Sequence, residues 1–233
     1  EPYYAELGLP KPKRPRRYHP CFEDQIEVLI DKRPAAISFV FGVPAPKVLE
    51  RCRERGIVTV GTASTLDEAK MLDAARMDII VASGFEAGGH RPSFLRPAEA
   101  SLVGTFALTQ LVASRVSAPV IAAGGIVDGA GIRAAMLLGA QGAQLGTAFL
   151  ATAESGTNDQ HRAQLFGAQA QQTVLTRSYT GRLARGILNP WIEALEPRRA
   201  ELAPFPVQSF FFAPIKAAAL RTGRTDYMSL YAG

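Results

Sequence analysis

A short apolar run followed by an amphipathic helical pattern recurs along this sequence, and this repeat constrains the fold more than any other feature. The apolar runs begin near residues 37, 57, 79, 119 and 142. Apolar runs without polar alternation are typical of strands that are covered on both faces, and the helices between them supply that cover. The pattern therefore predicts a parallel α/β sheet, either closed into a barrel or doubly wound.

Local signals mark where the helices begin and end. Pro46 suits the first turn of a helix that follows the first apolar run, and Gly56 suits its C-terminal cap. Residues 64–68, STLDE, place a serine or threonine three residues before an acidic side chain, which is the pattern of a capping box. These signals support alternating strands and helices.

The starts of the repeats fit a (β/α)8 TIM barrel well. Five of its eight strands are visible and the sequence starts with Glu1, so we expect a chain that lacks about three N-terminal βα units. Such a piece would expose sheet edges and should be unstable alone. We expect residues 1–35 to form a connector, 36–156 the C-terminal part of the barrel, and 157–233 a helical segment at the barrel mouth.

Composition excludes several classes of protein. The 233 residues are 47% hydrophobic and 20% charged, and no apolar run reaches the ~18 residues of a membrane helix. No signal peptide is visible, so we expect a cytoplasmic globular protein. The net charge is +5, yet the basic residues 11–17 are interleaved with prolines, which favours a solvated connector over a nucleic-acid site. Cys21 and Cys52 are expected to be reduced thiols.

Glycines follow two consecutive strand candidates, at the strand ends where barrel enzymes build their sites. A glycine lets backbone N–H groups approach an anion closely, and the next helix adds its positive N-terminus. We therefore predict a phosphate cradle, although tight turns alone would also explain the glycines. Its members are Gly124, Gly125, Gly146 and Thr147, with the threonine hydroxyl as a further donor.

A third loop at the same expected edge, GFEAGGH, ends in His90, one of three histidines. A flexible glycine turn would let this imidazole reach the cavity above the strand ends, and an imidazole titrates near neutral pH. We expect His19 and His161 to be surface or capping residues. Phe210–Phe212 form an aromatic cluster that is expected to serve packing.

Three segments carry a resemblance to a known family. The chain is similar to the nitronate monooxygenases, formerly called 2-nitropropane dioxygenases, which are FMN-dependent TIM-barrel enzymes. The resemblance runs from about residue 34 to 189, and MSLYAG at the end resembles the family's C-terminal segment. It rests on the stretches SGFEAGGHRPSF, PVIAAGGIVDGAGIRAAMLLGAQGAQLGTAFLATAESG and LTRSYTGRLARGILN.

The resemblance implies roles for particular residues. His90 would lie beside the flavin and act as a catalytic base or as the partner of the substrate anion. Ser83, where many relatives have glutamine, and Thr62, where another branch has lysine, would be weak flavin contacts. Glu86 would orient the turn or His90, or be solvated at the loop edge. The glycines and threonine of the predicted cradle, Gly124, Gly125, Gly146 and Thr147, would hold the FMN phosphate.

The activity implied is oxidation of small anionic nitronates, such as propionate 3-nitronate, by molecular oxygen to a carbonyl compound and nitrite. No metal, nucleic acid or membrane partner is expected, and a homodimer is an option. One alternative is an FMN-dependent enoyl-(acyl carrier protein) reductase, which shares the EAGGH loop and would consume NAD(P)H. Another is a noncatalytic barrel that binds a phosphate ligand.

Overall fold

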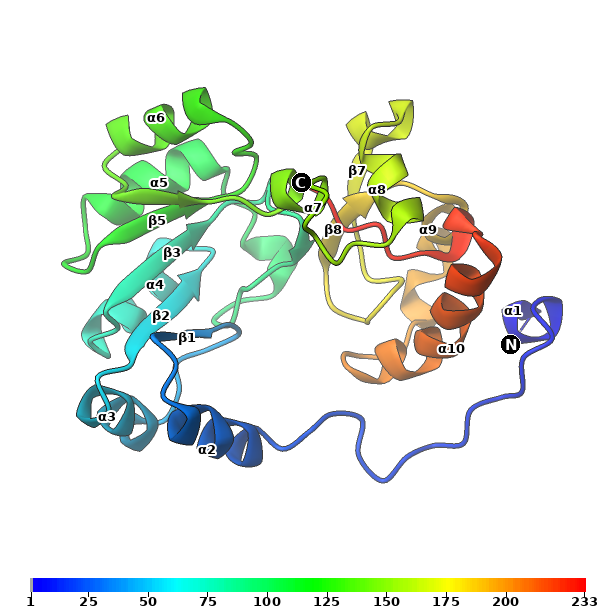
Figure 1. Cartoon of the computed structure of the whole chain (residues 1–233), viewed down its shortest axis with the longest axis horizontal. Coiled ribbons are helices and arrows are strands. Elements are labelled where there is room, and N and C mark those ends of the chain that lie inside the picture. The colour runs from blue at the N-terminus through cyan, green and yellow to red at the C-terminus, as the bar shows by residue number, and fades with distance from the viewer. Residues whose placement is uncertain (1) are drawn as a thin grey trace. The chain divides into compact units, whose positions relative to one another are not determined.

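A computed structural model describes residues 2–233, and these residues form two compact units (Figure 1). The first, here called the sheet unit, comprises residues 20–87 and 91–146. The second, here called the aromatic unit, comprises residues 2–19, 88–90 and 147–233. The chain therefore leaves the sheet unit for three residues, 88–90, before it returns.

The sheet unit is built on five parallel strands whose spatial order follows the chain, β1-β2-β3-β5-β6. This order is that of a TIM barrel, in which each strand pairs with the previous one. Within residues 2–233 the sheet is open, with β1 and β6 at its edges. The predicted α/β class and all five predicted strands are confirmed. The strands are β1 (Ala36–Phe39), β2 (Val58–Ala63), β3 (Ile79–Ser83), β5 (Val120–Ala123) and β6 (Gly142–Gln144).

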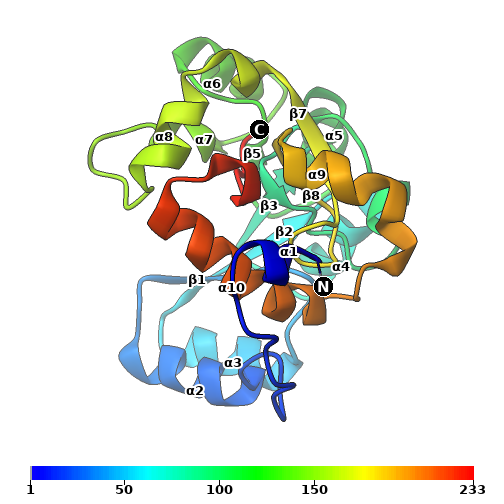
Figure 2. The ribbon, with the colours of Figure 1, turned by 90° about the vertical axis from the view of Figure 1, so that its right-hand side faces the viewer.

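Helices follow the strands as the repeat predicted. Pro46 lies in the first turn of α3, and the Thr65 side chain caps α4 by accepting a hydrogen bond from the backbone N–H of Glu68. Helices α2 and α3 lie side by side (Figure 2). The helices of this unit are α2 (Phe22–Lys32), α3 (Pro46–Glu54), α4 (Leu66–Ala74), η1 (Ala98–Ala100), α5 (Thr105–Ala113) and α6 (Gly129–Leu137).

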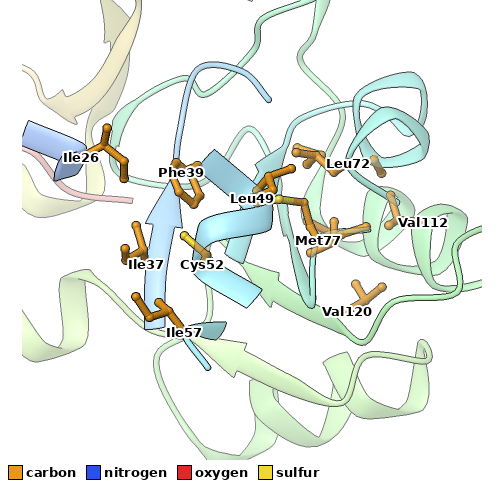
Figure 3. Packing of buried hydrophobic residues seen from close by; sticks show 14 of the residues in the cluster. Ile26, Ile37, Phe39, Leu49, Cys52, Ile57, Leu72, Met77, Val112 and Val120 are labelled. Carbon is orange, nitrogen blue, oxygen red and sulfur yellow. The ribbon is translucent and has the colours of Figure 1, made fainter. Parts of the chain in front are cut away.

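The core of the sheet unit lies between the strands and helices α2 to α5 (Figure 3). Ile80 and Leu72 are completely buried there, as is Cys52, one of the two free cysteines. Burying each of these large aliphatic side chains stabilises the fold by ~1.5–3 kcal/mol. A smaller cluster around Ala122 and Ala135 packs α6 on β5.

The aromatic unit contains a three-stranded antiparallel sheet, β4-β8-β7, that the sequence did not predict. The pattern of residues 157–233 suggested helices alone, because strands of four residues with mixed polarity give a weak periodic signal. Its strands are β4 (Gly89–His90), β7 (Thr173–Thr176) and β8 (Ala184–Ile187). Its helices are α1 (Pro2–Glu6), α7 (Thr147–Leu150), α8 (Asp159–Leu165), η2 (Ala168–Gln171), α9 (Pro190–Leu195), η3 (Glu196–Glu201), α10 (Val207–Thr222) and η4 (Thr225–Tyr227).

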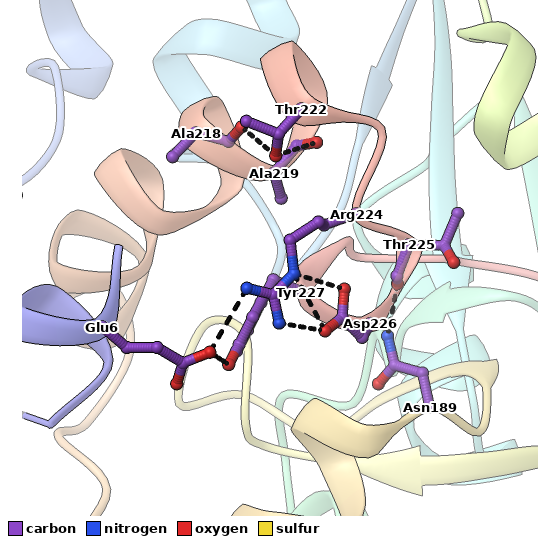
Figure 4. Close-up of polar contacts among 9 residues, drawn as sticks. All are labelled: Glu6, Asn189, Ala218, Ala219, Thr222, Arg224, Thr225, Asp226 and Tyr227. Atoms are coloured by element: carbon purple, nitrogen blue, oxygen red, sulfur yellow. Dashed lines mark hydrogen bonds and ion pairs between the residues drawn. The ribbon is translucent and has the colours of Figure 1, made fainter. Parts of the chain in front are cut away.

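Aromatic rings form much of the core of this unit. Trp191 packs on Phe212 with ring centroids 5.0 Å apart, and Tyr3 packs on Trp191 at 4.7 Å. The predicted packing role is thus confirmed for Phe212. Glu6 accepts hydrogen bonds from the Arg224 guanidinium at 3.2 Å and the Tyr227 hydroxyl at 2.7 Å, which tie α1 to η4 (Figure 4).

Thr147 begins the short helix α7, and the strand before it ends at Gln144. The expectation for His161 was wrong. His161 lies in the first turn of α8 but is buried, and its Nε2 lies 3.1 Å from the carbonyl oxygen of Tyr231. A partner far away in the sequence therefore accounts for its burial.

Candidate functional site

The ends of β3, β5 and β6 place four of the predicted site residues along one edge of the parallel sheet. Ser83 is the last residue of β3 and pairs in register with Ala123, the last residue of β5. Gly124 and Gly125 follow β5, and Gly146 follows β6 by two residues. Because parallel strands end at the same edge, the sheet unit brings these positions together, as the sequence predicted.

The glycines of this edge have different physical reasons to be glycine. Gly124 has φ +116°, and a Cβ on it would lie 2.7 Å from the Thr105 hydroxyl oxygen and 2.9 Å from the Ala87 nitrogen. Gly125 has φ +67°. Gly146 has neither a positive φ nor any atom within 4 Å of the position of a Cβ. Open space beside its backbone is what close approach of a ligand requires.

Other groups limit what this edge offers to an anion. The Asp128 carboxylate caps α6 by accepting from the backbone N–H of Gly131 at 2.9 Å, so one donor of this helix N-terminus is already used. In the aromatic unit, the Thr147 hydroxyl oxygen accepts from the backbone N–H of Gly233 at 3.0 Å, which leaves its own proton for donation.

Ser83 and Thr62 occupy different environments. Ser83 is buried, and its carbonyl oxygen accepts from the Arg91 guanidinium at 3.0 Å. Thr62 is half-buried on β2, in register with Val81 of β3. Both lie near the carboxyl ends of their strands, as a flavin contact requires, but neither shows a further feature that selects it.

The loop after β3 is held in place by charged groups. The Glu86 carboxylate accepts from the backbone N–H and the hydroxyl of Thr105, each at 2.8 Å, so it is not merely solvated. The Arg91 side chain is completely buried and donates to the carbonyl oxygens of Gly84 and Ser83. These bonds anchor the chain on both sides of residues 88–90.

A third anchor is Glu68, whose side chain is completely buried. Its carboxylate accepts from the backbone N–H groups of Phe94 (2.7 Å), Leu95 (3.2 Å) and Ser64 (2.7 Å), and from the Ser64 hydroxyl (2.8 Å). Burial raises its pKa, but these donors outweigh that effect and hold the pKa below its usual value. Glu68 thus links the start of α4 to the segment that follows Arg91.

His90 lies in the aromatic unit, where strand β4 pairs it with Ala184 of β8. Its Nε2 lies 2.7 Å from the hydroxyl oxygen of Thr180. The ring contacts two aromatic side chains, with its centroid 5.9 Å from that of Phe205 and 5.6 Å from that of Tyr231. The contacts of the imidazole therefore include two aromatic rings and the Thr180 hydroxyl.

Burial lowers the pKa of His90, and the positive charge of Arg182 lowers it further. The imidazole is consequently neutral near neutral pH. A neutral imidazole has one nitrogen with a free lone pair, which is the form required of a general base. The site thus provides a confined base beside a cationic side chain.

Sequence reasoning missed Thr180, Arg91 and Glu68 as parts of this arrangement. Thr180 comes from a turn 90 residues after His90, and no local signal connects them. The position of Arg91, shortly after a buried strand and a glycine turn, was a usable signal. A buried arginine needs acceptors, and carbonyl groups are available at such a position. His19, expected to be a surface residue, is indeed exposed.

The aromatic unit also contains a cavity of about 560 Å³ whose lining includes Tyr3, Trp191 and Phe212 with Arg14 and Arg198. None of the predicted site residues is among the described residues that line it. No helix within residues 2–233 is both long and apolar enough to cross a membrane. In the same residues, no three His, Cys, Asp or Glu side chains are grouped so that they would hold a metal ion.

Comparison with known proteins gives consistent results. A family model described as nitronate monooxygenase matches residues 3–233. A protein of Staphylococcus aureus named probable nitronate monooxygenase is 38% identical over 234 residues; the match covers 100% of this chain but only 66% of that relative. The chain thus spans slightly less than two thirds of the length of the curated relatives that it matches.

Solved structures point in the same direction. The nitroalkane oxidase of Streptomyces ansochromogenes is 36% identical, with a TM-score of 0.91 over 100% of this chain and 67% of that one. FabK of Thermotoga maritima is 29% identical, with a TM-score of 0.75 over 92% of this chain and 65% of that one. The likeness to the nitroalkane oxidase is greater by both measures.

Proposed function

Because the chain belongs to the nitronate monooxygenase family, we propose that it acts in the flavin-dependent oxidation of alkyl nitronates by molecular oxygen, which yields a carbonyl compound and nitrite. The observation that carries the proposal is His90, a confined imidazole that is neutral near neutral pH and lies in the EAGGH segment. The substrates are small anionic nitronates, such as propionate 3-nitronate.

The flavin is FMN in this proposal, and the residues at the sheet edge fit its phosphate. Gly146 fits best, because the open space beside its backbone admits an anion. Gly124 and Gly125 contribute backbone N–H groups, and the Thr147 hydroxyl has a proton to donate. Ser83 and Thr62 are weaker candidates for ring contacts. When bound, the flavin supplies the electron transfer from the nitronate and to oxygen.

His90 has two tasks in the proposed reaction. With a neutral nitroalkane, its lone pair takes a proton from the carbon next to the nitro group and so forms the nitronate. With a substrate that is already a nitronate, no proton has to be removed, and the imidazole only orients the anion. The nearby positive charge of Arg182 favours an anion at this position.

The experiment that tests the proposal is an absorption spectrum of the purified protein with FMN, followed by oxygen uptake. We expect bound flavin and oxygen consumption with propionate 3-nitronate. His90→Ala should reduce the rate with the neutral nitroalkane by on the order of 10²–10⁴, the usual contribution of a general base, and affect the nitronate far less. The matched control is His19→Ala, which changes an exposed histidine of the connector.

The two alternatives predict different results. An enoyl-(acyl carrier protein) reductase consumes NAD(P)H with an enoyl substrate and shows no oxygen uptake with the nitronate. A noncatalytic phosphate-binding protein remains colourless after FMN is added. The boundaries 1–35, 36–156 and 157–233, the homodimer and the cytoplasmic location stay predictions, which size-exclusion chromatography, limited proteolysis and cell fractionation address.

A further inference from the structure

The hydrogen bond between His90 and Thr180 joins strand β4 to the turn between β7 and β8. Thr180 lies in this turn, and its hydroxyl oxygen is 2.7 Å from Nε2 of His90. The turn itself is held firmly: the backbone N–H of Gly181 donates to the Arg177 carbonyl at 2.8 Å, and the Arg177 guanidinium donates to the Gly181 carbonyl at 2.8 Å. The hydroxyl is therefore presented from a fixed position.

Gly181 explains why the turn has little freedom. It is buried with φ +83°, and a Cβ on it would lie 2.4 Å from the carbonyl oxygen of Ala203. Only glycine fits this conformation and this close approach. The turn that carries Thr180 is thus fixed by sterics as well as by hydrogen bonds.

The Thr180 hydroxyl has one proton and two lone pairs, so its partners can be counted. Besides His90, the oxygen lies 3.3 Å from the carbonyl oxygen of Arg182 and 3.3 Å from the Arg182 nitrogen. If the hydroxyl donates to the Arg182 carbonyl, it can accept from both the Arg182 N–H and an Nε2–H of His90. If it donates to Nε2 instead, the contact with the Arg182 carbonyl is lost. The first arrangement satisfies three contacts and the second only two.

We propose that Thr180 is the positioning residue of His90: its hydroxyl accepts from Nε2–H and holds the imidazole in that tautomer, so that Nδ1 carries the basic lone pair. The tautomer is inferred from the partners of the Thr180 hydroxyl, while the use of Nδ1 as a base rests on the proposed function. Phe205 and Tyr231 restrict the ring plane, and Thr180 selects which nitrogen bears the proton.

The charged and titratable groups around the ring are compatible with this assignment. Burial and the positive charge of Arg182 disfavour the imidazolium, so the neutral ring is the relevant species near neutral pH. Burial raises the pKa of Tyr231 to about 12, so this phenol stays neutral. Arg185, which pairs in register with Gly89, donates to the Thr173 hydroxyl oxygen at 3.0 Å.

The first test needs no activity. Long-range ¹H–¹⁵N spectra of the full chain report the tautomer of each histidine, and the His90 signals are assigned by their loss in His90→Gln. We expect the Nε2–H tautomer in the wild type and in Thr180→Ser, and a mixture of tautomers with a changed pKa in Thr180→Val. Thr222→Val is the matched control, because the Thr222 hydroxyl bonds the carbonyl oxygen of Ala218 within α10.

An Nδ1–H tautomer in the wild type would overturn the proposal, and this measurement does not depend on whether Thr180→Val folds. An unchanged tautomer and pKa in folded Thr180→Val would overturn it as well.

The second test uses the protein loaded with FMN and assumes the proposed function. Thr180→Val should lower kcat for the neutral nitroalkane by about 10–100-fold, the loss typical when a partner that orients a metal-bound imidazole is removed, with little change in KM. Thr180→Ser should restore the rate, and oxidation of the nitronate should change far less. Equal losses with both substrates would contradict the positioning role. Wild-type protein without oxygen uptake would refute the proposed function and leave the spectroscopic test intact.

Discussion

The sheet unit fixes its irregular segments with a buried carboxylate, whereas the aromatic unit uses a buried amide for the same purpose. Glu68 accepts four hydrogen bonds, and every partner is a donor. Asn189 also makes four: it accepts from the Ile192 N–H and the Tyr179 hydroxyl, and donates to the carbonyl oxygens of Thr225 and Met228. The difference teaches that the mixture of partners selects the chemical group, because a carboxylate only accepts while an amide does both.

The two units also differ in how many separate segments of the chain build them. The sheet unit is a run of local βα repeats that is interrupted only by residues 88–90, while the aromatic unit collects three separate segments. The only tryptophan of the sequence, Trp191, is buried in the aromatic unit. Tryptophan fluorescence therefore reports on that unit alone, and hydrogen exchange reports on both.

The largest effect is expected for Glu68→Ala. The substitution leaves up to four buried donors without an acceptor, and we expect it to lower the free energy of unfolding by ~3–5 kcal/mol. Urea denaturation, combined with hydrogen exchange at residues 64–68 and 94–95, measures the effect. The control is Asp67→Ala, which removes an exposed carboxylate one position earlier. A Glu68→Ala protein as stable as the control would show that the hydrogen bonds of the Glu68 carboxylate contribute nothing to stability.

Asn189→Asp should have the next largest effect on stability. The new carboxylate would face the carbonyl oxygens of Thr225 and Met228, and we expect a loss of ~2–4 kcal/mol in the urea transition followed by Trp191 fluorescence. Asn158→Asp is the matched control, because Asn158 caps α8 by accepting only from the His161 N–H, and either residue does this. Equal stability of both variants would show that the buried site at Asn189 accepts a carboxylate as well as an amide.

Smaller effects should separate the glycines of the sheet edge. Gly124→Ala meets both a positive φ and close neighbours, so it should cost ~1–3 kcal/mol of stability. Gly146→Ala meets neither and should change stability by less than ~0.5 kcal/mol. Its effect should instead be on FMN: we expect affinity, measured by quenching of flavin fluorescence, to fall about tenfold, which equals ~1.4 kcal/mol. Unchanged affinity would remove Gly146 from the cradle.

The pH dependence of stability should show the smallest difference between the units. Burial lowers the pKa of both His90 and His161 from 6.5. Between the folded-state pKa and 6.5 the unfolded chain binds more protons, so stability falls as the pH drops below 6.5. The pKa of Glu68 is lowered from 4.5, so its contribution is complete above 4.5 and is lost only below that pH.

The aromatic unit should therefore weaken first on acidification. Urea midpoints from Trp191 fluorescence should decrease between about pH 7 and about pH 5, in the range where imidazoles titrate, before hydrogen exchange around Glu68 accelerates. His161→Gln should reduce this slope. A slope that is the same in the variant and the wild type would show that the pKa of His161 does not differ between the folded and unfolded states.

Much of the sheet unit was predictable because its signals are local. All five parallel strands, the start of α3 at Pro46 and the capping of α4 by Thr65 follow from apolar runs and from residues a few positions apart. The positions of Ser83, Gly124 and Gly146 at one edge follow from the same repeat, since parallel strands end together. Family membership was also visible in the motifs around His90, Gly124 and Gly146.

The surroundings of those residues depended on contacts between distant parts of the chain. The bond of His90 to Thr180 and the bonds of Glu68 to the N–H groups of residues 94 and 95 join segments that no periodic pattern relates. The antiparallel strands β7 and β8 were missed for the same reason, because their stability comes from pairing and not from their own four residues. Local sequence thus set the strands, helices and caps, while the tertiary structure chose the partners of each polar side chain, since only folding brings distant donors and acceptors within reach.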